Sequence, residues 1–136
     1  MSYAVSAALQ VAVFGALAGD AALDALVDGA IFDADPTGAL PAQYVSLGAE
    51  RARDRSDGSG GGAVHEFDVS VVSDGDGFHA TKLIAAAVSD LLVDADLTLS
   101  RGRLVSLRFY KAKAARVENG RVRRIDLTFR ARVQDD

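Results

Sequence analysis

Cysteine is absent from the 136 residues of the chain, and no apolar run approaches the roughly 20 residues of a membrane-spanning helix. Without cysteine there is no disulfide, no thiolate nucleophile and no thiolate metal site. The apolar N-terminal stretch has no lysine or arginine before it, so we expect an amphipathic helix there and not a signal peptide. These absences predict a soluble protein, made in the cytoplasm, with no membrane contact.

Residue types that perform catalysis are sparse as well. The two histidines are His65, expected on the apolar face of a strand as a hydrogen-bonded edge residue, and His79, expected exposed in the first turn of a helix. The "GSGGGA" segment at 58–63 lacks the Gly-Lys-Ser/Thr ending of a phosphate-binding loop. "DGDG" at 74–77 begins like a calcium loop, but Ala85 stands where that loop requires glutamate. We therefore predict no catalytic residue, no cofactor and no metal, and hence no enzyme.

Charge is unevenly distributed along the chain. The net charge is −4, but residues 1–100 hold 4 basic and 15 acidic groups, whereas residues 101–132 hold 11 basic and 2 acidic groups. This polarity is typical either of ordinary solvated faces or of complementary surfaces for self-association or an acidic partner. Nucleic acid is a weaker alternative, because the chain is acidic overall and only Tyr110 interleaves the basic hairpin as a stacking aromatic.

Apolar spacing predicts two main helices and a short one. Recurring apolar residues between Val5 and Leu17 predict a first helix, capped by Ser2 and ending near Gly19. Asp20 is placed to cap a short second helix with Gly29 at its C′ position. A further long helix follows, capped by Asp74 or Asp76. Its predicted buried stripe is Ala80, Ile84, Ala87, Val88 and Leu91.

Strand patterns fill the rest of the chain. We expect a brief strand in "AIFDA", one over 43–49, and one over 64–73 with His65 and Phe67 on its apolar face. Residues 50–63 lie between two of these strands and are charged and glycine-rich. Because a hairpin needs only a two-residue turn, this excess predicts either a working loop or a disordered one, flexible in both cases.

The last third of the chain is a hairpin whose register can be inferred from its apolar residues. A two-residue turn at Asn119 and Gly120 places Phe109 opposite Arg130, whereas a three-residue loop with Gly120 left-handed places Phe109 opposite Phe129. A slip of one residue moves every side chain to the other face, so we predict the three-residue loop. Residues 111–124 are mostly small or basic and are expected to project beyond the core.

Together these elements predict one α+β domain over residues 1–136. Its expected architecture is a small sandwich, in which two main helices pack on one face of a mixed or mainly antiparallel sheet that ends in a long C-terminal β-hairpin.

The order of elements resembles a known family. The stretches "AIFDADP", "YVSLG", "HEFDVSVVS" and "GFHATKLIAAAVSDLL" are similar to the small tail-completion, or tail-terminator, proteins of long-tailed phages. The amino-acid sequence is especially similar to versions from gene transfer agents of alphaproteobacteria, and the resemblance covers essentially the whole chain. The family has no catalytic signature, so the likeness lies in the order of elements.

The resemblance implies a structural role at the tail–neck junction of a phage-like particle assembled in the bacterial cytoplasm. Such proteins form a ring, usually a hexamer, that ends the tail tube and joins it to a neck or stopper protein, and DNA passes through the ring without sequence-specific binding. An adjacent neck protein of similar build is the alternative. The residues expected to bind partners are charged and lie in the loop and the hairpin: Arg51, Arg53, Asp54, Arg55, Asp57, Lys111, Lys113, Arg116, Arg121, Arg123 and Arg124.

Overall fold

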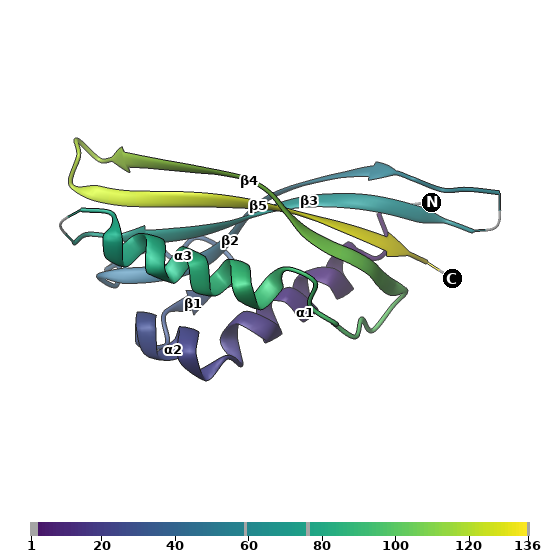
Figure 1. Cartoon of the computed structure of the whole chain (residues 1–136), viewed down its shortest axis with the longest axis horizontal. Coiled ribbons are helices and arrows are strands. Elements are labelled where there is room, and N and C mark those ends of the chain that lie inside the picture. The colour runs from purple at the N-terminus through teal and green to yellow at the C-terminus, as the bar shows by residue number, and fades with distance from the viewer. Residues whose placement is uncertain (1–2, 59, 76, 136) are drawn as a thin grey trace.

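The computed structural model describes residues 3–58, 60–75 and 77–135. In this part of the chain, five strands form one sheet and three helices cover one of its faces (Figure 1). The helices are α1 (Ser6–Ala18), α2 (Ala21–Val27) and α3 (His79–Leu92). The strands are β1 (Ile31–Phe32), β2 (Gln43–Asp54), β3 (Gly62–Ser73), β4 (Arg103–Val117) and β5 (Val122–Gln134).

The sheet is mixed, with the strand order β1-β2-β3-β5-β4. Only β1 and β2 run parallel, and the other neighbouring pairs are antiparallel. The predicted α+β class, with helices on one face and a long C-terminal hairpin, is confirmed. The two outer strands differ greatly in length, because β1 has two residues and β4 has fifteen.

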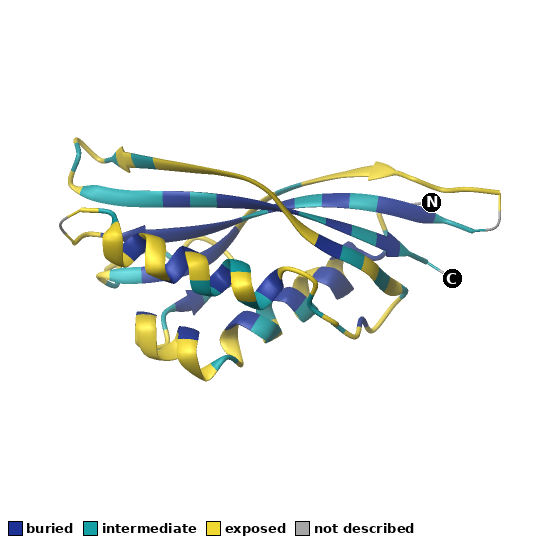
Figure 2. Ribbon diagram, viewed as in Figure 1, coloured by how far each residue is buried: buried dark blue, intermediate teal, exposed yellow. Residues whose placement is uncertain are grey.

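The core lies between the helices and the central strands β3 and β5. Their alternating inward side chains are buried as predicted, and the rings of Phe67 and Phe129 stack with centroids 5.8 Å apart. The helices supply buried Leu9, Leu17 and Ile84 from the other side. Figure 2 shows the same division, with buried residues where helices and sheet face each other. Burial of this apolar layer is the main contribution to stability.

The ends of α1 and α2 follow local signals. Asp20 accepts a hydrogen bond from the N–H of Leu23 at 2.9 Å and so caps α2, as predicted. Gly29 follows α2 with φ of +76°, a left-handed conformation that glycine adopts without strain. Ser2, the expected cap of α1, lies outside the described residues.

The predicted start and stripe of α3 need correction. The N-cap is Phe78, which makes no side-chain capping bond, so Asp74 is not the cap of α3. Asp76 lies outside the described residues. Ala80 is exposed, and the fully buried positions are Thr81, Ile84, Ala85, Val88 and Leu92. The helix is thus rotated slightly from the predicted face, since Leu92 and not Leu91 reaches deepest into the core.

The predicted loop at 50–63 is largely strand. β2 continues to Asp54 and β3 begins at Gly62, so only residues 55–61 connect them. A β-bulge at Gly48 and Ala49, where the register shifts between Leu47 and Glu50, lets the strand go on past the glycine. Ser59 in the connection lies outside the described residues.

Two register shifts interrupt the β4–β5 hairpin, one between Leu104 and Ser106 and one between Phe109 and Lys111. Phe109 pairs with Phe129, as predicted, but the three-residue loop is wrong. Near the turn Val117 pairs with Val122, the register of an Asn-Gly turn, and the register shifts between Phe109 and Lys111. Tyr110 is therefore the extra residue that brings Phe109 opposite Phe129. Gly120 is left-handed, with φ of +81°, as predicted.

The β2–β3 hairpin extends past the helix layer in Figure 1, whereas the tip of β4–β5 lies over the start of α3. Arg123, near that tip, lies 5.8 Å from the ring of Phe78. The β5 side of the tip therefore contacts α3, whereas the β4 side is exposed (Figure 2). Projection of residues 111–124 beyond the core stays a prediction.

No single helix in the described ranges is long and apolar enough to span a membrane. Only α1 and α2 taken together, across a bend of 74°, reach the length and composition of such a span.

Candidate functional site

The face of the sheet that bears no helix carries a network of charged side chains, which we name the open face. It comprises the outward residues of β2, β3, β4 and β5 opposite the core, among them Arg51, Glu66, Asp68, Ser70, Arg108, Lys111, Lys113, Arg124, Asp126, Thr128, Arg130 and Arg132. Alternation along each strand places them there, because their neighbours in the chain face the helices.

Glu66 is the centre of this network. Arg130 Nε donates a hydrogen bond to Glu66 Oε2 at 2.6 Å, and Arg51 Nε lies 3.6 Å from Oε1. The bond from Arg130 lowers the pKa of the Glu66 carboxyl and outweighs the effect of desolvation. The guanidinium of Arg130 also stacks on Tyr110, 3.5 Å from the ring centroid. Four strands are thus linked across the open face by one carboxylate, two arginines and the ring of Tyr110.

Shorter links continue the network toward the β4–β5 turn. Thr128 Oγ1 donates to Asp68 Oδ1 at 2.7 Å, and Ser70 Oγ donates to Asp126 Oδ1 at 2.6 Å. Arg124 donates to both Asp126 Oδ1 and Ser70 Oγ at 3.0 Å. These bonds are made within one chain, so they order the surface before any partner arrives.

The predicted loop residues separate into two groups. Arg51 belongs to the open face, and Arg53 lies further along β2 on the same side. Asp54 ends the strand and accepts a bond from Ser56 Oγ at 2.7 Å, which lowers the pKa of the Asp54 carboxyl. Arg55 and Asp57 lie in the connection, which is bound to itself because their backbone N–H groups bond to Gly62 O and Gly60 O.

The predicted hairpin residues also divide. Lys111 and Lys113 are exposed on the open face, and Arg116 is exposed on the opposite side of β4. Arg121 is exposed in the turn. Arg123 and Arg124 are only partly exposed and bind within their own chain, so they stabilise this fold in addition to any partner contact.

A partly buried polar cluster joins the start of α1 to the sheet. Glu50 accepts bonds from Ser6 Oγ at 2.8 Å and from the hydroxyl of Tyr3, and its Oε2 lies 3.2 Å from His65 Nδ1. His65 is fully buried, and its Nε2 has no hydrogen-bond partner among the described residues. The predicted bonding of His65 is confirmed, but β3 is a central strand, so the expected edge position is wrong.

Glu50 was missed by sequence reasoning because of the bulge. Strict alternation from Leu47 places residue 50 on the open face, and the extra residue at 48–49 turns it toward α1 instead. No local sequence signal marks this turn apart from Gly48.

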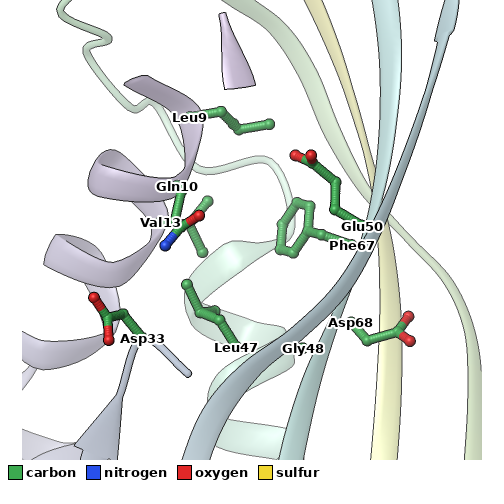
Figure 3. Close-up of a pocket in the computed structure, with 9 residues that line it drawn as sticks. All are labelled: Leu9, Gln10, Val13, Asp33, Leu47, Gly48, Glu50, Phe67 and Asp68. Atoms are coloured by element: carbon green, nitrogen blue, oxygen red, sulfur yellow. The ribbon is translucent and has the colours of Figure 1, made fainter. Parts of the chain in front are cut away.

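Glu50 also lines the small cavity in Figure 3, of about 50 Å³, between α1 and the bulge. In that view Glu50 and Phe67 point toward Leu9 and Val13, while Asp68 points to the other side of the sheet. The space holds little more than a water molecule. In the described ranges, no three His, Asp or Glu side chains are grouped to hold a metal ion.

Comparison with known proteins identifies the class. Residues 11–134 match the family described as Tail completion protein gp17. The chain therefore belongs to this family of tail completion proteins. The predicted resemblance is confirmed, and so is the expectation of a structural protein that is not an enzyme.

Among solved structures, the chain is similar to a protein in "Virion of native gene transfer agent (GTA) particle". The two share 59% sequence identity over 98% of this chain and 99% of the other, with a TM-score of 0.92. No curated protein sequence matches the chain.

Proposed function

We propose that the protein is the tail terminator of a gene transfer agent particle. In this role it forms a ring, with six copies as the expected number, at the head-proximal end of the tail tube. The ring stops polymerisation of the tube protein, binds the neck or stopper protein, and lets DNA pass without reading its sequence. The observation that carries the proposal is the 59% identity, over nearly the whole chain, to a protein of such a virion.

The geometry supports an assembly role. The β2–β3 hairpin extends past the helices, and all described residues from Arg51 to Gly58 are exposed. β3 pairs with β5 as far as Gly62, so this end of the hairpin belongs to the sheet. β1 pairs with β2 only at Val45 and Ser46, so the outer edge of β2 has no strand of the described chain beside it here, and an open strand edge favours pairing with another subunit. The arginines of the hairpin offer forked donors for carboxylates of a tube or neck protein. We therefore assign Arg51, Arg53, Asp54, Arg55 and Asp57 to contacts with other particle proteins.

Deleting the gene in cells that make the particle tests the proposal. We expect tails of uncontrolled length in electron micrographs of the purified particles. Supplying the natural chain, or the His79→Ala variant as a matched control at an exposed position, restores normal particles. Normal tails in the deletion strain overturn the proposal. Defective heads with normal, unjoined tails assign the protein to the neck instead.

A further inference from the structure

The two edges of the sheet carry opposite charge. Residues 1–50 contain six acidic residues and no lysine or arginine, and five of the six lie between Asp20 and Asp35, around α2 and β1. Residues 101–117 contain six basic residues and no acidic residue, and β4 occupies most of this segment. Because β1 and β4 are the outermost strands of the sheet, the acidic and basic segments lie at opposite edges.

We name these regions the acidic edge and the basic edge. The acidic edge consists of α2, β1 and the residues that follow β1, with Asp24, Asp28, Asp33 and Asp35. The basic edge is β4 from Val105 to Arg116, with Arg108, Lys111, Lys113 and Arg116.

The basic edge repels itself within one chain. Arg108 stands directly opposite Arg130, and Arg116 directly opposite Arg123. Like charges directly opposed across two strands destabilise the pair. Lys113 and Arg116 form no ion pair with any other described residue. Asp94 and Asp96 share a shallow groove with Arg108, but this groove lies at the N-terminal end of β4, formed with residues 104–108. Lys113 stands opposite Asp126, which already accepts bonds from Ser70 and Arg124, so an external anion adds stability to this edge.

Both edges also expose apolar side chains. Val105, Phe109 and Tyr110 on β4 are 45%, 47% and 45% exposed, and Leu26 on the acidic edge is 42% exposed. Figure 2 shows β4 exposed for most of its length, unlike its neighbour β5. Apolar and aromatic contacts surrounded by charge are the composition of protein–protein interfaces. An uncovered edge strand of fifteen residues also invites association.

We infer that the basic edge of one copy docks on the acidic edge of the next copy. This contact uses two different patches and is therefore heterologous, the kind that closes into a ring when the rotation between copies permits. It rests on the proposed ring and names the surfaces that build it. A second copy fits better than nucleic acid, because this chain itself supplies the complementary acidic edge and is acidic overall.

A charge-swap experiment tests the contact in particle-producing cells that lack the natural gene. The basic-edge variant is Lys111→Glu with Arg116→Glu, and the acidic-edge variant is Asp24→Lys with Asp33→Lys. All four positions are exposed. Matched controls are Lys82→Glu and Asp90→Lys, single reversals at exposed positions of α3, which packs under β3 and β5.

Each edge variant alone is expected to reduce the amount of this protein per purified particle about tenfold or more, because like charges then meet at every contact. Co-expression of the two variants restores it. Each reversed edge then faces the reversed edge of the other variant, and the natural edges face each other. The variants alternate around the ring, which an even number of copies allows. The α3 controls incorporate normally.

Three results overturn the inference. The first is normal incorporation of either edge variant alone. The second is failure of co-expression when both purified variants unfold cooperatively like the natural chain. The third is a combination of two observations: the basic-edge variant loses salt-sensitive binding to a double-stranded DNA fragment, and the acidic-edge variant incorporates normally. That combination assigns the basic edge to nucleic acid. None of these results tests the proposed terminator role, because that role is tested by the gene deletion.

Discussion

At the scale of single residues, Glu50 is the polar contact that matters most for the fold. Its carboxylate collects bonds from Ser6, Tyr3 and His65, which come from the start of α1 and from β3. Two of these groups, Ser6 and His65, are buried and lose their water on folding, so they depend on this one acceptor.

Replacing Glu50 with alanine is expected to lower the free energy of unfolding by about 2 kcal/mol, because buried donors lose their only partner. Urea unfolding measures this loss. Asp33→Ala is the matched control, since Asp33 lines the same cavity but is exposed, and it should change stability little. A loss in Glu50→Ala no larger than in the control contradicts this role.

Glu66 makes stability depend on pH. Its pKa is lowered in the folded protein by the bond from Arg130. A lowered pKa stabilises the fold above the ordinary value of 4.5, and this contribution disappears as the pH falls through the folded value. Glu66→Gln should therefore be less stable than the natural chain at pH 7, by up to about 1 kcal/mol, and this difference should be smaller at pH 3.

Thermal unfolding at both pH values tests this expectation. Glu118→Gln, in the exposed β4–β5 turn, is the control and should show no such difference. A difference for Glu66→Gln that persists unchanged at pH 3 rules out the ion pair as its cause.

At the scale of elements, the bulge at Tyr110 joins the register near the β4–β5 turn to the register of the Phe109–Phe129 pair. Removing Tyr110 leaves Lys111 paired with Thr128 and Phe109 paired with Phe129, now without interruption. Deletion of one residue from a strand normally moves its buried side chains to the wrong face. Here the deletion should retain a cooperative fold.

The expected cost of deleting Tyr110 is about 1–2 kcal/mol, from loss of its stacking with Arg130 and its partial burial. Deleting Thr128 is the matched control. β5 pairs with β3 without any bulge, so this deletion shifts one end of β5 and should prevent folding. Circular dichroism during urea unfolding separates the two. Loss of the fold in the Tyr110 deletion contradicts the bulge.

At the scale of the whole molecule, the two hairpin turns lie at opposite ends of the long axis (Figure 1). The β4–β5 turn lies over α3, whereas the β2–β3 hairpin continues past the helices. This placement suits an arm that reaches another protein while the helix layer and the two edges remain free.

Replacing residues 55–62 with Asn-Gly shortens this arm to a two-residue turn after Asp54. We expect the midpoint of thermal unfolding to change little, because a surface connection adds little stability. Particles should show unjoined heads or tails of abnormal length. Normal particles from this variant contradict a role for the arm. The mobility predicted for the loop in the isolated subunit stays a prediction, which hydrogen exchange can measure.

The sequence by itself determined the central elements. Alternation in β3 and β5, helical spacing in α1, and the cap at Asp20 are local patterns whose physical cause lies within a few residues. The charge polarity was also visible in the sequence, although its separation to two edges of one sheet was not. For these reasons the α+β class and the family resemblance could be predicted from the amino-acid sequence alone.

Only the tertiary structure decided which way several side chains face. The bulges at 48–49 and at Tyr110 turn Glu50 toward α1 and bring Phe109 opposite Phe129. The same applies to Arg123 and Arg124, which look like a free tip in the sequence but bind Gly120 and Asp126. A bulge costs ladder bonds locally and is favoured only by burial of residues far along the chain. Its position therefore depends on partners that no short stretch of sequence contains.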